Sequence, residues 1–562
     1  SIIDKTAFLC DNIYIAEARI VYAHVRRRRV LSEYQLRQSL DTLESHKCLD
    51  HAFFDALTLA QHAVKENNDP DLVRLFAEHG ADLQRPLRTA VMDETLSGAD
   101  RNRWVRFLLS LGADPNTTTT DPSGMLLDET EHATLYMKYF FDRARTCEAF
   151  KNRTVRADRL GKVARPPPDG AGLQFLPRLP EIFFSLVGQL PAAHMVFNKV
   201  SAWAFRLASQ PKPLILMFGG ASGHGKTEFA EALSLLISGG RDHFLKVPCE
   251  QMRTATEVFG LGGAYQGAEQ GSQLNNFISG HAGKPGVVLF DEIEKAKKEV
   301  WESLLNIWDR GEWQDKKLTE GRSQTRNVDC TRILWILTTN AFDPLIEHFA
   351  KDNAQLVRFR QQRAMELESK IDMLLRKQAR SKFSIPFAAR ISSFVPFFPF
   401  QMGHELREQE VQVLIDMGLQ DALDFHRAEA KNKHCSLYVQ LSPETHLEFA
   451  DMAKSHFIAP EGARSVQRCI DRYVSDPIES IWVAGEVSEC GGVLSMHVDK
   501  EDAATWFSVE SYGLAISRES TSDDEQADSP QPFGRHPDRR AQRRSRRKRG
   551  TRGTRRKKAD LN

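Results

Sequence analysis

Residues 213–227 read Pro-Leu-Ile-Leu-Met-Phe-Gly-Gly-Ala-Ser-Gly-His-Gly-Lys-Thr, an apolar run followed by a glycine-rich loop. The run has the length and composition of a buried β-strand, and the residues after Thr227 follow a helical pattern. The loop has the spacing Gly-x-x-x-x-Gly-Lys-Thr, which cradles phosphates when it joins a strand to a helix. The stretch therefore predicts a phosphate-binding loop in an α/β domain with a parallel sheet between helices.

Each polar or flexible position of this loop has a predicted role toward ATP and Mg²⁺. The glycines Gly220, Gly223 and Gly225 let backbone N–H groups turn toward the phosphates, and the start of the next helix adds partial positive charge. Lys226 is predicted to neutralise phosphate charge, and Thr227 is predicted to be a Mg²⁺ ligand.

Two further apolar runs end in residues that suit nucleotide hydrolysis. Residues 287–290 lead into Asp291 and Glu292, and residues 333–339 lead into Asn340. Of two adjacent carboxylates at a strand end, one can bind the metal ion and the other can act as a base toward water. We therefore expect Asp291 to hold Mg²⁺ and Glu292 to activate water. The amide of Asn340 is predicted to orient the same water molecule, although a polar residue that merely ends a strand is the alternative.

The N-terminal part contains an internal repeat. Residues 73–82 are echoed by residues 105–114, an offset of 32 residues, and both copies end in Gly-Ala-Asp after an amphipathic helix. A glycine in a left-handed conformation ends such a helix, and Asp then supports the turn. Because two units cannot bury a stable core alone, flanking atypical repeats are expected within residues 50–152.

Composition places the chain among soluble multidomain proteins. Its 562 residues exceed one hydrophobic core, and 41% hydrophobic with 27% charged residues excludes a fibrous or wholly disordered protein. Eight cysteines lack zinc-site spacing, and no apolar run reaches the length of a membrane span.

The formal charge of +1 hides a basic tail. Residues 534–562 carry 14 Lys or Arg and two Asp, which leaves about −11 on the rest of the chain. A nuclear-import signal, a polyanion-binding arm and a solvated low-complexity tail are three interpretations of this segment.

The predicted domains follow from these patterns. They are an N-terminal helical segment (1–49), helical repeats (50–152), a linker rich in proline (153–180), a large ATPase domain (181–398), a small α/β domain (399–510) and a disordered tail, acidic then basic (511–562).

Several short motifs together resemble AAA+ ATPases, specifically the second ATPase module of the ClpB family of unfoldases and disaggregases. The residues 73–82 and 105–114 resemble ankyrin repeats, which points to ankyrin-containing mitochondrial members of that family. The motifs that carry the ATPase resemblance are 187–189, 290–296, 304–311, 338–340, 387–391 and 462–464.

The resemblance implies roles that the residues alone do not establish. Arg390 resembles the arginine finger that reaches a neighbouring subunit, so a homo-oligomeric ring, a hexamer by resemblance, is expected. Its unpaired charge needs an anion, and either a phosphate or a carboxylate satisfies that need. Arg464 resembles the arginine that contacts nucleotide in the same subunit, and Val187 and Gly188 resemble the segment beside adenine.

Residues 259–271 form a glycine-rich stretch between the phosphate loop and Asp291. This stretch resembles a central-pore loop. Tyr265 is its only aromatic residue after Phe259, and an aromatic ring can grip an extended chain without reading its sequence. An exposed surface loop is the alternative interpretation.

The expected function is an ATP-dependent unfoldase or disaggregase that acts on misfolded or aggregated proteins, with the ankyrin-like region making protein contacts. An intracellular location is expected, the mitochondrion by resemblance, with cytoplasm and nucleus as alternatives. A nucleic-acid-remodelling ATPase, suggested by the basic tail, and an ankyrin scaffold with a structural nucleotide are the rival hypotheses.

Overall fold

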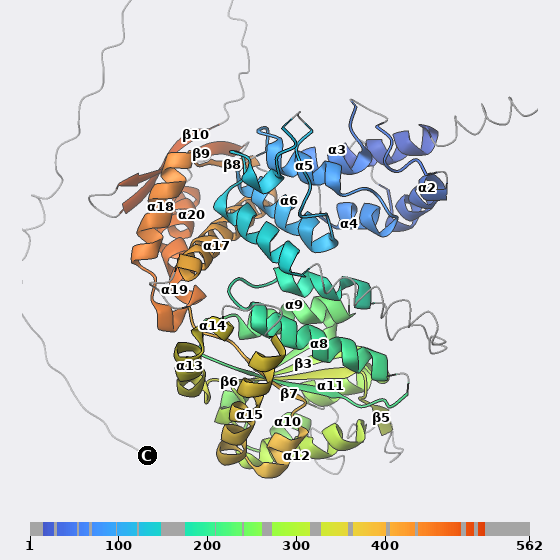
Figure 1. The fold of residues 1–562 in the computed structure, drawn as a ribbon, viewed down its shortest axis with the longest axis vertical. Helices are drawn as coiled ribbons and strands as arrows, with labels where there is room; N and C mark the ends of the chain where they lie inside the picture. Colours follow the sequence, from blue (N-terminus) through green and yellow to red (C-terminus); the bar gives the residue numbers. More distant parts are fainter. Residues whose placement is uncertain are drawn as a thin grey trace, which may run out of the picture. The chain divides into compact units, whose positions relative to one another are not determined.

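The fold is that of a computed structural model, drawn in Figure 1. The structure describes residues 15–26, 31–45, 47–52, 56–66, 70–96, 98–120, 123–147, 175–207, 209–238, 241–260, 272–314, 327–357, 364–400, 405–432, 436–484, 491–499 and 504–511. These described residues belong to one compact unit.

A five-stranded parallel sheet forms the centre of the large domain. Its order is β2 (Phe244–Pro248), β3 (Gly286–Asp291), β6 (Ile333–Thr339), β1 (Leu214–Gly219) and β7 (Ser393–Pro396). The three apolar runs singled out in the sequence are the adjacent strands β3, β6 and β1. Their carboxyl ends therefore meet at one edge of the sheet.

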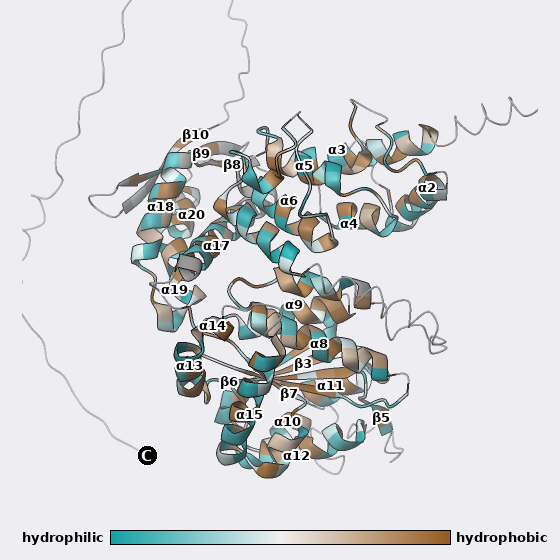
Figure 2. Cartoon of the chain, viewed as in Figure 1, coloured by the Kyte–Doolittle hydropathy of each residue, from teal (hydrophilic) through white to brown (hydrophobic). Residues whose placement is uncertain are grey.

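Helices cover both faces of this sheet because alternate strand residues point to opposite sides. Leu216 and Phe218 of β1 share a hydrophobic core with α8 (Leu190–Arg206) and α9 (Lys226–Ser238). Ile215 and Met217 join the opposite core, with α12 (Lys298–Arg310) and α15 (Ala364–Lys382). Figure 1 shows these helices on the two sides of the strands, and Figure 2 shows the strands as mainly hydrophobic.

Shorter elements complete the large domain. They are η3 (Arg241–His243), η4 (Cys249–Gln251), α10 (Ala255–Phe259), α11 (Gln273–Gly280), η5 (Ile293–Lys295), β4 (Glu312–Gln314), β5 (Asn327–Asp329), α13 (Asp343–Asp352), α14 (Ala354–Val357) and α16 (Ile385–Arg390).

Helices also make up the described part of residues 15–147, which we call the N-terminal helical module. It contains a helix over residues 15–25, then α2 (Glu33–Ser45), α3 (Leu59–Lys65), α4 (Pro70–Glu78), α5 (Gln84–Met92), α6 (Gly98–Leu111), η1 (Leu127–Glu129) and a helix over residues 135–147. The two copies of the repeat lie on α4 and α6. Gly80 and Gly112 follow these helices with φ of 83° and 108°, the left-handed conformation that the repeat predicted.

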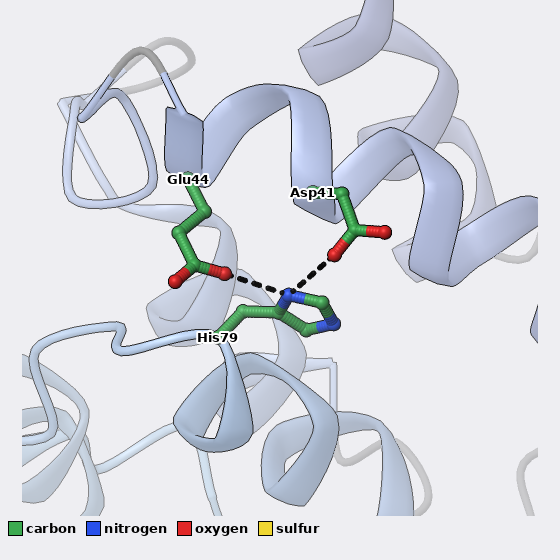
Figure 3. Close-up of side chains that lie close together, drawn as sticks. All are labelled: Asp41, Glu44 and His79. Carbon is green, nitrogen blue, oxygen red and sulfur yellow. Dashed lines mark hydrogen bonds and ion pairs between the residues drawn. The ribbon is translucent and has the colours of Figure 1, made fainter.

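A histidine joins two helices of this module (Figure 3). The Nδ1 atom of His79 lies 3.3 Å from a carboxylate oxygen of Asp41 and 3.0 Å from one of Glu44. An ionised carboxylate only accepts hydrogen bonds, so both contacts require the hydrogen of the imidazole on this nitrogen. The cluster acts as a contact between α2 and the end of α4.

The end of the predicted linker differs from the structure. Residues 175–180 were expected to be linker, but η2 (Leu176–Phe184) includes most of them, and Phe175, Leu176 and Leu179 are buried. Pro177 and Pro180 made this stretch look irregular. Pro177 stands in the first turn, where N–H groups need no partner within the helix, whereas Pro180 lies inside η2.

The small domain follows β7. It consists of α17 (Glu405–Asn432), β8 (Ser436–Gln440), α18 (Pro443–Ser455), η7 (Ala459–Glu461), α19 (Ala463–Ile470), η8 (Asp471–Ser475), α20 (Asp476–Ala484), β9 (Gly491–Asp499) and β10 (Ala504–Ser511). Strand β9 is central, parallel to β8 and antiparallel to β10.

Within the residues that the structure describes, no helix combines the length and apolar composition needed to cross a membrane.

Candidate nucleotide-binding site

The glycine-rich loop runs between β1 and α9, and its shape depends on glycine. Gly220 and Gly223 have φ of 144° and 79°. A Cβ atom on Gly223 would lie 1.9 Å from the carbonyl oxygen of Glu461, which belongs to the small domain. Any side chain at this position would therefore separate the loop from the small domain.

Lys226 is a buried cation at the start of α9, only 8% exposed. Its Nζ donates hydrogen bonds to the carbonyl oxygens of Gly220 and Ala221, and to Oδ1 of Asn340 at 2.8 Å. Burial lowers the pKa of Lys226 to about 8, against the opposing charges of nearby carboxylates. Such a cation favours an added anionic partner.

The ends of β3 and β6 are tied together through Thr338. Its hydroxyl donates to Oδ1 of Asp291 at 2.6 Å and accepts from the backbone N–H of Glu292 at 2.9 Å. Burial alone would raise the pKa of Asp291, but the Thr338 bond, the ion pair with Lys246 and the charge of Lys226 lower it overall. Asp291 is therefore ionised and suited to hold a cation.

Glu292 has the left-handed φ of 57°, which is rare for a residue with a side chain. Its Oε1 accepts a hydrogen bond from Nδ2 of Asn340 at 3.0 Å, and its Oε2 pairs with Lys295 at 2.6 Å. Lys295 also pairs with Glu250, and the two carboxylates raise the pKa of this lysine. The structure thus brings Glu292 and Asn340 into direct contact.

Two further carboxylates lie behind these groups. Glu294 accepts the backbone N–H of Asn340 at 2.8 Å through Oε1, and its Oε2 is buried without a hydrogen-bond partner. Oδ1 of Asp343, at the start of α13, is likewise buried and unpartnered. Burial raises the pKa of Asp343 to about 6, although the charge of Lys226 opposes this shift.

Residues of the small domain reach the same site. The backbone N–H of Ala463 donates to the carbonyl oxygen of Gly223 at 2.9 Å, and Arg464 follows directly in α19. Together with the strand ends, these residues enclose a cavity of about 710 Å³. Its polar lining includes Ser222, Lys226, Thr227, Lys246, Glu250, Asp291, Glu292, Lys295, Thr338, Asn340, Arg464 and Gln467, and Gly223 and Gly225 complete the loop side.

Among the described residues, three of the predicted site residues lie outside this cavity, and Gly220 is not in its lining but accepts a hydrogen bond from Lys226. Val187 and Gly188 do not line the cavity, although the preceding Leu186 packs against Gly225 of the loop. Arg390, at the end of α16, pairs with Asp309 of α12 and so has a carboxylate as its partner within the chain. Tyr265 lies outside the described residues.

Sequence reasoning missed several lining residues. Thr338 and Lys295 stand within the motifs already quoted, so their positions carried a signal that was not used. Lys246 of β2 pairs with Asp291 of β3, a tertiary contact that no local pattern reveals, and Gln467 stands one helical turn after Arg464 in α19.

The residues that line the cavity have the chemistry that would suit a nucleoside triphosphate with Mg²⁺. Lys226 and Arg464 supply cationic groups, and the loop supplies backbone N–H groups at a helix start. Thr227 and the ionised Asp291 supply the oxygen ligands that Mg²⁺ prefers.

Comparisons with known proteins agree with this geometry. Residues 212–393 match the family model described as "AAA domain (Cdc48 subfamily)". The chaperone protein ClpB of Lactiplantibacillus plantarum is 30% identical over 307 residues, which cover 54% of this chain and 31% of that protein. ClpB3 of Oryza sativa, a mitochondrial chaperone, is 28% identical over 316 residues, covering 55% of this chain and 29% of that protein.

A shorter relative matches over more of its own length. The ATP-dependent protease ATP-binding subunit-like protein AmiB of Pseudomonas aeruginosa is 28% identical over 300 residues, covering 52% of this chain and 75% of that protein. The matched part spans only about a third of the ClpB relatives. Residues 212–393 are therefore similar to an AAA domain, and the chain is related in sequence to part of the ClpB chaperones.

Proposed function

We propose that the chain is an ATP-driven protein unfoldase or disaggregase. The observation that carries the proposal is the single cavity on which the phosphate loop, two strand ends and the small domain converge. The sequence relationship to ClpB chaperones supports protein remodelling as the use of the hydrolysis energy.

The residues divide the chemistry of ATP hydrolysis. Lys226 and Arg464 bind phosphate oxygens, while Glu292 accepts a proton from the attacking water that Asn340 helps to orient. Mg²⁺, held by Thr227 and Asp291, neutralises phosphate charge when bound. The Glu292 contacts with Asn340 and Lys295 hold its carboxylate at the cavity wall.

Arg390 acts in trans within a homo-oligomeric ring, for which we propose a hexamer. Within the chain its guanidinium is held by Asp309, outside the cavity. In the ring, a phosphate bound in the neighbouring subunit becomes its partner and gains charge stabilisation in the transition state.

Tyr265 grips the substrate chain in the ring pore, and the N-terminal helical module is an ankyrin-like region that contacts proteins. The repeat on α4 and α6, each followed by a left-handed glycine, supports the second assignment. We propose the mitochondrion as the compartment, since a mitochondrial ClpB is among the relatives.

Recovery of activity from a heat-aggregated model enzyme tests the proposal. The full chain should restore activity with ATP and Mg²⁺ and should fail without ATP, or when Glu292 is replaced by Gln. Tyr265→Ala should keep ATP hydrolysis and lose recovery. Equal recovery by the wild type and Glu292→Gln would refute ATP-driven disaggregation, and equal recovery by Tyr265→Ala would refute the pore-loop role.

A nucleic-acid-remodelling ATPase is the second candidate, and the charge of residues 534–562 favours it. Comparison of ATP hydrolysis with and without RNA or single-stranded DNA, for the full chain and a chain lacking these residues, separates the two. Stimulation that disappears with the tail would support this candidate.

A further inference from the structure

The N-terminal helical module holds the second half of η2 and the turn that leads from it to α8. We call these residues, 181–189, the base-side segment. Arg143, only 5% exposed, donates from Nη1 to the carbonyl oxygens of Phe183 at 2.7 Å and Leu186 at 2.9 Å. Its other terminal nitrogen donates to the hydroxyl of Tyr139, which accepts the backbone N–H of Gly188 at 3.1 Å. These bonds join one helix, residues 135–147, to both halves of the segment.

A second arginine of the module completes the contact. Nε of Arg106, in α6, donates to the carbonyl oxygen of Phe184 at 2.8 Å, and its Nη2 donates to that of Ser185 at 3.1 Å. Four successive carbonyl groups, from Phe183 to Leu186, thus accept hydrogen bonds from two arginines. They end η2, where carbonyl groups lack partners within the helix and carry partial negative charge.

An ion pair fixes the start of the same segment. Nη1 of Arg74, in α4, lies 2.6 Å from Oε1 of Glu181, and neither side chain is more than 16% exposed. Three elements of the module, α4, α6 and the helix over 135–147, therefore hold one short segment of the ATPase domain. A recruitment domain that is only tethered to the ATPase domain would not need these three sets of contacts.

The base-side segment is in turn part of the wall around the phosphate loop. Two methyl groups of Leu186 lie where they would be 3.1 Å from a Cβ on Gly225. Gly188, with φ of 72°, packs against Phe400, and that ring stacks on His224 of the loop with centroids 5.3 Å apart. A shift of the segment would move the side chains that support loop residues 224 and 225.

We propose that Tyr139 and Arg143 are positioning residues of the nucleotide site, so that the N-terminal helical module completes the site by fixing the base-side segment. This inference rests on the proposed function, in which Lys226 of the phosphate loop binds phosphate oxygens. Without these bonds the segment must be ordered when nucleotide binds, and the ordering cost lowers the affinity.

Tyr139→Phe is the most selective variant. It keeps the ring, over which the Arg143 guanidinium lies at 4.9 Å, and removes only the hydroxyl between Arg143 and Gly188. Arg143→Lys is the second variant, because a lysine keeps the charge but lacks the planar fork, one arm of which reaches two carbonyl groups while the other reaches the Tyr139 hydroxyl. Lys138→Met is the control, since Lys138 is an exposed cation of the same helix.

Titration calorimetry of the full chain, with Mg²⁺ and either ATP or inorganic tripolyphosphate, distinguishes positioning from general packing. We expect both variants to bind ATP and tripolyphosphate about tenfold more weakly, because Leu186 and Phe400 support the phosphate loop, with Lys138→Met unchanged. A merely structural role would lower the unfolding temperature and leave the affinity of the folded protein for both ligands unchanged.

The outcomes separate this inference from the proposed function. If the wild type binds ATP and both variants bind it equally well, the positioning role is wrong and the nucleotide site stands. A loss of ATP affinity alone, with tripolyphosphate affinity unchanged, also overturns support of the phosphate loop. If the wild type binds neither ligand, the proposed function fails and takes this inference with it.

Discussion

Lys226 has carbonyl and amide oxygens as its partners where a bound phosphate would place anionic oxygens. Burial lowers its pKa to about 8 in the nucleotide-free protein. A phosphate beside the ammonium group restores a higher pKa, because opposite charges favour the charged form. Proton uptake should therefore accompany nucleotide binding, and affinity should fall as the pH rises through the value of 8.

Calorimetry in buffers of different ionisation enthalpy measures this uptake. We expect the Lys226 contribution to approach one proton at about pH 9 and to be about a quarter of a proton at pH 7.5. Lys226→Arg, whose side chain stays charged, should lack the pH-dependent part in any binding that it retains. Equal proton uptake at about pH 9 and at pH 7.5 would contradict the assignment of this uptake to Lys226.

Gly223 tests the contact between the phosphate loop and the small domain. Gly223→Ala puts a Cβ 1.9 Å from the Glu461 oxygen and forces alanine into a left-handed conformation, which should cost about 1–3 kcal/mol of unfolding free energy. ATP affinity should also fall, because Ala463 and Arg464 move away from the loop. Gly280→Ala is the matched control, since a Cβ at that position would have no heavy atom within 4 Å apart from its chain neighbours and the backbone of its own helix.

Denaturant unfolding and ATP titration of both variants check the prediction. Equal stability and affinity of Gly223→Ala and Gly280→Ala would show that the loop and the small domain are not held together at this point.

At the scale of elements, one hydroxyl adds to the backbone pairing of strands β3 and β6 at their carboxyl ends. Thr338 donates to Asp291 and accepts from the Glu292 N–H. Thr338→Val removes both bonds with little change of shape and leaves a buried N–H unpaired. Stability should fall by about 1–2 kcal/mol, and kcat for ATP hydrolysis should fall about 10- to 100-fold because both carboxylates lose their position.

Thr338→Ser keeps the hydroxyl and is the matched control. Steady-state hydrolysis and thermal unfolding of the two variants decide the question. If Thr338→Val hydrolyses ATP as fast as Thr338→Ser does, Thr338 does not position the carboxylates of Asp291 and Glu292.

The strand ends could be predicted from sequence because their signals are local. A continuous apolar run followed by Lys226, by Asp291 and Glu292, or by Asn340 identifies both the strand and its functional end. Segment η2 could not be recognised, because Pro177 and Pro180 made it look irregular. Its hydrogen-bond partners in the module, such as Arg74 and Arg143, are 107 and 40 residues away in sequence.

On the scale of the whole molecule, one hydrophobic core continues from the N-terminal helical module through η2 to one face of the sheet. Val105 and Phe140 of the module, Phe183 of η2 and Phe218 of β1 all belong to it. The 32-residue repeat predicted helices, but no sequence pattern indicated that they would share a core with the ATPase domain. Such contacts depend on complementary surfaces that only the folded chain brings together.

Removal of residues 1–147 should therefore expose apolar surface of η2 and α8. We expect the remaining chain to aggregate, or to unfold at a temperature at least several degrees lower, because exposed core residues each cost about 1.5–3 kcal/mol. A chain lacking residues 534–562, whose composition cannot form a core, is the control. Unchanged melting of the N-terminal truncation would contradict a shared core.

The central claim is that one cavity binds ATP and that Glu292 activates water within it. Parallel measurement of ATP affinity and of the hydrolysis rate, for the full chain and for Glu292→Gln, tests it most directly. We predict that the variant binds ATP within about threefold of wild type and hydrolyses it at least about 100-fold more slowly. Hydrolysis by Glu292→Gln at the wild-type rate, or no ATP binding by either protein, would contradict the account.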